Sequence, residues 1–338
     1  MKKTAVVILN FNGRNYLEMF LPSLLAYSGN SEIVVIDNQS TDDSLAFLSQ
    51  AYPDQVKVIE LPENLGFAGG YNEGLKQVKA DYYAIVNSDI EVTEQWLDPL
   101  VRFLDENPDY AACQPKIKAY KDKEKFEYAG AAGGFLDSFG YPYCRGRIFD
   151  EVEKDHGQYQ KTTDVFWTSG ACMLIRSKAF WEAGAFDQDF FAHMEEIDLC
   201  WRLHNLNYKL ACVPASTVYH VGGGTLAKSN PRKTYLNFRN GLSLLYKNLP
   251  KRHLWKIFVR MILDGFAAIK FGLENDFVHT KAVFIAHLHF YGQLRKNTQK
   301  RKIAPRKDIP GELKHIKFLA WYFYAAGNRI FTSKDKRA

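Results

Sequence analysis

The chain has 338 residues, 46% of them hydrophobic and 24% charged, which suits a globular protein with one large domain and a smaller one. No run approaches the ~18 consecutive apolar residues that cross a bilayer. Five scattered cysteines without a Cys-x-x-Cys pair argue against a disulfide framework or a zinc site and favour reduced thiols in the cytoplasm.

The net charge of +6 is unevenly distributed. Residues 292–338 hold 13 Lys and Arg against 3 Asp and Glu, so that this tail carries +10 and residues 1–291 carry −4. The basic character therefore belongs to the C-terminal tail. We expect no nucleic-acid partner, and the sequence leaves the oligomeric state open.

Short runs rich in β-branched residues alternate with helix-like apolar spacing in the first third of the chain. The predicted strands are residues 5–9, 32–36, 56–59 and 82–86, and the predicted helices are residues 16–27, 40–52 and 70–79. Such a series predicts an α/β fold with an open, mostly parallel sheet flanked by helices, whose ligand site lies beyond the carboxyl ends of the strands.

Later segments differ in composition. Residues 111–165 are rich in Gly, Tyr and charge and predict a loop-dominated insertion, order returns over residues 165–221, and helical spacing dominates thereafter. We therefore expect one domain over residues 1–228, made of an α/β part (1–110) and a part of mixed composition (111–228). A helical, basic extension is expected over residues 229–338.

Polar side chains stand where the first two predicted strands end. Asn10 and Asn12 follow the first strand, and Asp37 and Asn38 follow the second. An acid at a strand end can accept hydrogen bonds from a nucleobase or ribose, although no G-x-G-x-x-G follows the first strand, which disfavours a dinucleotide enzyme. Asp37 could equally be a turn residue or helix cap.

A glycine-dense segment, residues 64–74, runs from a loop into a predicted helix. Glycines allow close backbone approach, and the free N–H groups of a helix start attract phosphate. A plain flexible loop is the alternative.

Asp89 emerges from the fourth predicted strand in the sequence Asn87-Ser88-Asp89, and His220 precedes three glycines at the end of a β-rich run. Oxygen ligands suit Mg²⁺ or Mn²⁺, which are held by one or two carboxylates together with substrate phosphates. Asp89 and His220 are thus candidate metal ligands. The alternatives are a helix cap and a structural histidine.

Three acids, Glu195, Glu196 and Asp198, fall within four positions of a predicted helix start. Clustered carboxylates raise one another's proton affinity, which suits a general base. Acids at this place also stabilise a helix against its dipole, which is the structural alternative.

Taken in order, these segments resemble the family 2 glycosyltransferases with the GT-A fold, especially the branch with bacterial rhamnosyltransferases. The resemblance covers about residues 4–225 and is carried by residues 7–12, 35–42, 64–72, 87–89, 190–202 and 219–220. It implies an inverting transfer of a sugar, with rhamnose the first expectation, from a dTDP-, UDP- or GDP-sugar to a lipid-linked or surface-polysaccharide acceptor.

The resemblance makes residues 1–228 a catalytic domain, with a donor-binding part (1–110) and an acceptor-side part (111–228). It also implies roles for individual residues. Asp89 and His220 would bind Mg²⁺ or Mn²⁺, and Glu196 would be the base, with Glu195 and Asp198 beside it. The implied donor-binding residues are Asn10, Asn12, Asp37, Asn38, Asn64, Gly66, Phe67, Asn72, Asn87 and Ser88. Two positions depart from the family pattern, since the usual Glu-Asp pair is Glu195-Glu196 and Asn87 replaces the first acid of a D-x-D motif.

Two other functions remain open at this point: a non-catalytic module that binds nucleotide sugars or glycans, and a nucleotidyltransferase. The basic, Lys/Arg-bearing glycine segment typical of the latter is absent near the N-terminus, where residues 10–14 hold a single glycine.

The extension carries a further expectation. Trp255, Phe258, Ile262, Phe266 and Ile269 recur at helical spacing among basic residues, and residues 318–324 add an aromatic cluster. Basic amphipathic helices with bulky aromatics lie in the headgroup region of membranes, so we expect peripheral association with an anionic cytoplasmic membrane face. Packing on the catalytic domain or forming a dimer are the alternatives.

Overall fold

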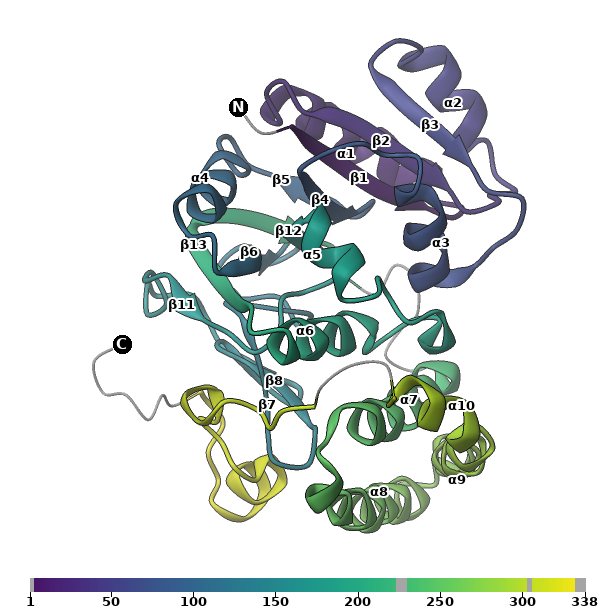
Figure 1. The fold of residues 1–338 in the computed structure, drawn as a ribbon, viewed down its shortest axis with the longest axis vertical. Coiled ribbons are helices and arrows are strands. Elements are labelled where there is room, and N and C mark those ends of the chain that lie inside the picture. The colour runs from purple at the N-terminus through teal and green to yellow at the C-terminus, as the bar shows by residue number, and fades with distance from the viewer. Residues whose placement is uncertain (1–2, 223–229, 303–305, 332–338) are drawn as a thin grey trace.

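A mixed sheet forms the centre of the protein in the computed structural model, which describes residues 3–222, 230–302 and 306–331 (Figure 1). Within these residues the sheet has nine strands in the order β11-β13-β6-β12-β4-β1-β2-β3, with β5 paired to β13. The strands are β1 (Thr4–Asn10), β2 (Glu32–Asp37), β3 (Val56–Glu60), β4 (Tyr82–Asn87), β5 (Ile90–Val92), β6 (Tyr110–Ala119), β11 (Thr163–Asp164), β12 (Cys172–Arg176) and β13 (Lys209–His220).

The first four strands confirm the predicted α/β architecture. β1 pairs in parallel with β2 and β4, and β2 pairs in parallel with β3. The residues of β1, β2 and β4 are almost entirely buried, as expected for strands covered on both faces by helices. The polar residues that follow these strands therefore lie at one edge of the sheet.

The described residues form ten α-helices, among them the three with predicted ranges, two of which are shifted. They are α1 (Arg14–Tyr27), α2 (Ser44–Ala51), α3 (Gly66–Leu75), α4 (Asp98–Glu106), α5 (Ser177–Glu182), α6 (Glu195–Asn205), α7 (Pro231–Asn248), α8 (Trp255–Leu273), α9 (Phe277–Gly292) and α10 (Leu294–Lys300). Helix α2 starts four residues later than predicted because the N–H groups of Ser40 and Thr41 donate to the side chains of Asp37 and Asn12, which holds that segment in a turn. Helix α3 starts four residues earlier, at Gly66.

Turns and loops make up most of residues 111–165, as predicted, but this segment is not a simple insertion into the fold. This segment supplies β6, which lies inside the main sheet, and a small four-stranded sheet of β7 (Gly134–Leu136), β8 (Pro142–Cys144), β9 (Arg147–Ile148) and β10 (Glu151–Val152). Its polar residues are paired inside the protein: Gln114 accepts from the Ser169 N–H, and Lys116 forms a buried ion pair with Asp155 at 2.8 Å. Pairing of this kind is not visible in composition.

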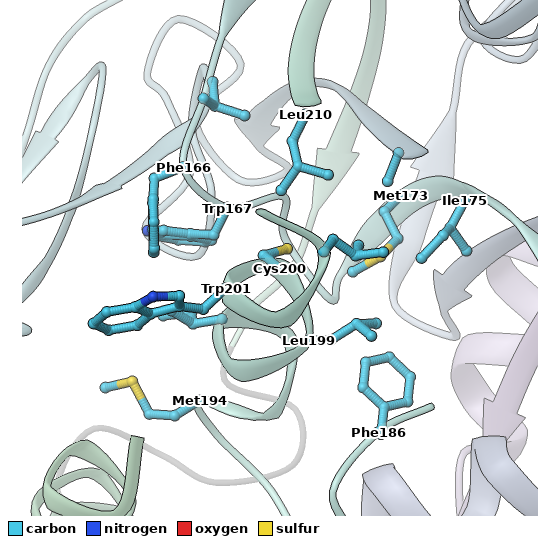
Figure 2. Packing of buried hydrophobic residues seen from close by; sticks show 14 of the residues in the cluster. Phe166, Trp167, Met173, Ile175, Phe186, Met194, Leu199, Cys200, Trp201 and Leu210 are labelled. Atoms are coloured by element: carbon cyan, nitrogen blue, oxygen red, sulfur yellow. The ribbon is translucent and has the colours of Figure 1, made fainter. Parts of the chain in front are cut away.

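Helix α6 is fixed by a dense apolar core (Figure 2). Trp201 stacks edge-on against Phe166, with ring centroids 5.4 Å apart, and Cys200 and Leu199 lie on the same helix near Met173 (Figure 2). The rigid packing of α6 sets the position of the acids at its start.

Residues after position 229 share this core. Leu242 and Leu245 of α7 and the later Leu319 and Phe331 are buried in the same cluster as the residues around α6. The predicted domain boundary at 228 lies outside the described residues, and it stays a prediction. No described helix combines the length and apolar content that crossing a bilayer requires.

Candidate active site

Asp89 and His220 are brought together by the pairing of β5 with β13. Asp89 directly precedes β5, and in this antiparallel pair Ile90 lies opposite His220. The Val221 N–H also donates to the Asp89 carbonyl at 3.0 Å. As a result, Asp89 Oδ1 lies 3.1 Å from His220 Nε2, although the residues are 131 positions apart.

Glu127 completes this cluster and was missed by the sequence analysis. Its Oε2 lies 3.2 Å from His220 Nδ1, and both side chains are buried. Its own N–H donates to the Ile117 carbonyl, so the chain after β6 turns back along that strand toward His220. An acid in a charge-rich segment carries no local signal of this contact.

The two carboxylates determine the charge of His220. Burial opposes the charged imidazole, but Glu127 and Asp89 outweigh burial and raise the pKa of His220 to about 10. Burial likewise opposes the charged form of Asp89, yet the hydrogen bond and charge of His220 lower the pKa of Asp89. The cluster thus holds one positive charge between two negative ones, at a place suited to a cation.

Glu195 and Glu196 face the same space from the start of α6. They line a cavity of about 380 Å³ together with Asp89, His220 and Glu127. Burial raises the pKa of Glu196 to about 7, and burial and the charge of Glu196 raise the pKa of Glu195 well above its usual range. One oxygen of each glutamate, Oε2, has no hydrogen-bond partner among the described residues. Glu196 is therefore poised to exchange a proton near neutral pH.

Asp198 differs from its two neighbours and is a correction to the predicted cluster. It does not line this cavity but accepts from Arg202 at 2.9 Å, from Lys247 at 2.8 Å and from Asn248 at 2.8 Å. Burial opposes its charge, but Lys247 and Arg202 outweigh burial and lower the pKa of Asp198. A carboxylate with all these partners anchors α7 to α6 and is not available as a base.

The loop before α6 holds an uncommon backbone conformation. Phe191, His193 and Met194 have positive φ angles of 63°, 67° and 73°, a region that non-glycine residues rarely adopt. The Asn240 side-chain amide, from α7, donates to the carbonyls of Phe190, Ala192 and His193 at 3.1, 2.9 and 2.7 Å. Asn240 therefore holds the loop that presents the two glutamates.

The predicted donor residues at the ends of β1 and β2 form a network within the protein. Asn10 Nδ2 donates to Asp37 Oδ2 and to Ser40 Oγ, each at 3.0 Å, and Asp37 Oδ1 accepts from the Ser40 N–H at 2.8 Å. Asn10 and Asp37 are buried, whereas Asn12 is exposed. The turn interpretation of Asp37 agrees with these bonds, and Asn12 is the side chain that faces solvent.

The glycine-dense segment is shaped by two asparagines. Asn38 Nδ2 donates to Asn64 Oδ1 and to the Gly66 carbonyl, and Asn38 Oδ1 accepts from the Leu65 N–H at 3.0 Å. At the start of α3 the Phe67 N–H donates to the Phe191 carbonyl at 2.9 Å, so this group is not free for a phosphate as the sequence suggested. The donor-side segment and the loop before α6 are thus joined directly.

The remaining predicted donor residues fall in different places. Phe67 and Asn87 line the cavity beside Asp89, and the half-buried Ser88 lies between Asn87 and Asp89. Asn72 does not line this cavity: its amide is bonded at both ends to the backbone of Phe186, at 2.8 and 3.0 Å. Its role is to hold the chain between α5 and α6.

The donor atoms of this site fit a hard divalent cation. No group of three or more His, Cys, Asp and Glu residues is arranged to hold a metal within residues 3–222, 230–302 and 306–331. Asp89 and His220 supply one oxygen and one nitrogen at one side of an open cavity. Mg²⁺ and Mn²⁺ commonly bind through so few protein ligands when substrate phosphates and water complete their coordination.

Comparison with known families agrees with this arrangement. The profile of glycosyl transferase family 2 matches residues 5–184, more than half of the chain. The chain belongs to glycosyl transferase family 2. The match includes β1 to β4 and Asp89, and it ends before the loop that carries Glu195 and Glu196.

Two relatives of this family 2 glycosyltransferase are rhamnosyltransferases. The N-acetylglucosaminyl-diphospho-decaprenol L-rhamnosyltransferase of Mycobacterium tuberculosis is 26% identical over 286 residues, which cover 78% of this chain and 90% of the relative. The rhamnosyltransferase WbbL of Escherichia coli is 27% identical over 222 residues, which cover 64% of this chain and 82% of WbbL.

Solved structures share the GT-A fold at low sequence identity. GalNAc-T7 with UDP, GalNAc and Mn²⁺ has a TM-score of 0.58 at 16% identity, covering 91% of this chain but 59% of that enzyme. S. aureus TarS 1-349 in complex with UDP-GlcNAc has a TM-score of 0.55 at 17% identity, covering 83% and 79% of the two chains. These likenesses establish the fold.

The contacts of Asn240 lead to a prediction. Asn240→Ala removes three hydrogen bonds to buried loop carbonyls, so the free energy of unfolding should fall by about 2 kcal/mol or more. Amide hydrogen exchange of residues 190–196 should also increase. Asn297→Ala is the matched control, because the Asn297 amide is equally buried and makes one long bond, 3.4 Å to Ser243. Equal exchange of the loop in both variants would contradict the role of Asn240.

Proposed function

We propose that this glycosyltransferase transfers a sugar, with rhamnose the first candidate, from a nucleotide-diphosphate donor to a hydroxyl of a lipid-linked or surface-polysaccharide glycan, with inversion. The observation that carries the proposal is that Asp89, His220 and Glu196 line one cavity. A cation-binding pair and a proton acceptor on one cavity are what such a transfer needs. The two rhamnosyltransferase relatives support the choice of sugar. The donor that we propose first is dTDP-rhamnose, ahead of UDP- and GDP-sugars.

Asp89 and His220 would hold Mg²⁺ or Mn²⁺ on the donor diphosphate. A bound cation offsets the negative charge that builds on the leaving nucleoside diphosphate. Glu127, 3.2 Å from His220 Nδ1, would orient the imidazole so that Nε2 points to the cation. Binding requires the neutral imidazole, so the proton that His220 carries without a cation must leave.

Glu196 would accept the proton of the acceptor hydroxyl as that oxygen attacks the anomeric carbon. The bond from this carbon to the diphosphate oxygen breaks in the same step, so the configuration inverts. Glu196 replaces the shorter aspartate of the usual family pair, and its place on the cavity wall supports the assignment. Burial and the charge of Glu196 raise the pKa of Glu195 well above its usual range, so Glu195 would stay protonated and could donate a hydrogen bond.

The donor would lie between the sheet edge and the glycine-dense segment. Asn12, Asn87, Ser88 and Phe67 would contact it, while the buried Asn10 and Asp37 would frame the nucleoside end. Asn38, Asn64 and Gly66 would act by fixing the shape of the segment. A lipid-linked acceptor would place the enzyme at the cytoplasmic face of a membrane as a peripheral protein.

The metal proposal predicts that Asp89→Asn and His220→Ala abolish the Mn²⁺-dependent part of nucleoside diphosphate binding. A ligand that binds only the native state at 100 times its Kd adds ~2.7 kcal/mol of stability, which a thermal shift with dTDP or UDP detects with and without Mn²⁺. Glu91→Gln is the control, because Glu91 lies on the adjacent β5 but pairs with Lys123. If both site variants keep the full Mn²⁺-dependent shift, the two residues do not hold the cation.

The base proposal predicts a pH dependence. A carboxylate with a raised pKa of about 7 is protonated below that pH and cannot accept a proton, so kcat/KM should fall tenfold per pH unit below about 7 and level off above it. Glu196→Gln should lower kcat by ~10² or more and abolish this limb. Glu195→Gln, which mimics a protonated glutamate, should retain most of the turnover. An inactive Glu195→Gln variant together with an active Glu196→Gln variant would assign the role of base to Glu195 instead.

A further inference from the structure

Large exposed apolar side chains are concentrated at one end of the molecule. Of 18 such side chains among the described residues, 14 lie between residues 255 and 330. On α8 they are Trp255, Phe258, Ile262, Phe266, Ile269 and Leu273, spaced three or four residues apart, with exposed fractions from 46% to 80%. This spacing places them in one stripe along the helix.

The opposite side of α8 is fixed to the protein. Ile257, Arg260 and Asp264 are its buried residues, and Arg260 pairs with Asp264 at 2.7 Å. Tyr141 joins this pair, since its hydroxyl donates to Asp264 at 2.9 Å and its ring lies 3.7 Å from the Arg260 guanidinium. Helix α8 is thus held with its apolar stripe turned outward.

Two neighbouring segments extend the stripe. Helix α9 packs beside α8 (Figure 1) and exposes Phe277, Phe284, Leu288 and Tyr291, and the Tyr291 hydroxyl reaches Met261 of α8 at 3.5 Å. Tyr324 and Trp321 are exposed as well, and Lys270 Nζ lies 5.6 Å from the Tyr324 ring centroid. We call the exposed apolar side chains of α8, α9 and residues 321–324 the apolar face.

The charges around the apolar face are mainly positive. Residues 251–292 hold 6 Lys and Arg against 3 acids, and Lys251, Lys270 and Lys281 are exposed. Of the acids, Asp264 is buried, Glu274 lies 3.9 Å from Lys270 and Asp276 binds His279. Protein interfaces are depleted in lysine, and a second copy would bring these cations against one another. Anionic headgroups are complementary to them.

The geometry points to the apolar face as a docking surface for a bilayer with anionic headgroups, in which the aromatic and aliphatic side chains enter the headgroup boundary and the lysines contact lipid phosphates. This inference rests on the proposed function in one respect, because the lipid-linked acceptor of that function would lie in such a bilayer. Membrane docking also fits a face with eight aromatic residues among its 13 exposed apolar ones.

Flotation of the full chain with vesicles tests this surface. Wild-type protein should bind vesicles of phosphatidylglycerol and phosphatidylethanolamine, more weakly at high salt and more weakly to phosphatidylcholine alone. Phe258→Glu with Phe266→Glu should reduce binding at least tenfold. Met19→Glu with Tyr27→Glu, which adds the same charges at exposed apolar positions of α1, should bind as wild type.

Three results would overturn the inference. The first is that the wild type does not bind anionic vesicles, and the second is that both double variants lose binding equally. The third is that light scattering shows a wild-type dimer that does not bind vesicles and that only the Phe258/Phe266 substitutions dissociate. Thermal melts of all variants check folding. Release of nucleoside diphosphate with a short-chain acceptor in detergent is measured in parallel. That activity should be the same in wild type and the Phe258/Phe266 variant, so a loss of vesicle binding is distinguishable from a failure of the proposed transfer.

Discussion

The side-chain amide of Asn240 controls the geometry on which the candidate site depends. It donates to three carbonyls of residues 190–193, a loop that contains Phe191 and His193 with positive φ. Such residues cost on the order of 1–3 kcal/mol each and persist only where the surroundings enforce them. Arg239 adds two hydrogen bonds to the carbonyls of Asp189 and Phe190. Helix α7 therefore belongs to the site, although it lies outside the segment that matches the family profile.

The same loop connects the two halves of the cavity. The Phe191 carbonyl accepts a hydrogen bond from the Phe67 N–H at the start of α3. Glu196 follows two residues after Met194, the last residue of this stretch with a positive φ angle. The donor-side segment is thereby hydrogen-bonded to the loop that leads to Glu196. The cavity walls also carry two glutamates with raised pKa values beside the Asp89–His220–Glu127 cluster. Such a concentration of acids favours a cationic ligand, which is consistent with the proposed cation.

Much of this arrangement was predictable because it follows from local patterns. Buried runs of β-branched residues identify β1, β2 and β4, and a residue directly after a parallel strand lies at the ligand edge. Asp89, which follows β4, can thus be placed at the ligand edge from sequence, and it lies 3.1 Å from His220. The spacing on α8 likewise predicted one apolar stripe, and its residues are exposed.

Other features depend on partners distant in sequence and could not be read locally. Three acids near the start of α6 look alike in sequence, yet Asp198 is neutralised by Lys247, 49 residues later. Glu127 reaches His220 only because β6 pairs with β13. Asn38 and Asn72 carry polar groups that suit a nucleotide, but their amides donate hydrogen bonds to the carbonyls of Gly66 and Phe186. Polar residues reveal a candidate site, whereas tertiary pairing decides which of them are free.

The central claim is a single displacement at the anomeric carbon, with Glu196 as the base. Its most direct test is the anomeric configuration of the product, determined from the one-bond carbon–hydrogen coupling at the transferred sugar in NMR spectra. The account predicts a configuration opposite to that of the sugar in the nucleotide donor. Retention of the donor configuration would contradict a single displacement and with it the role of Glu196.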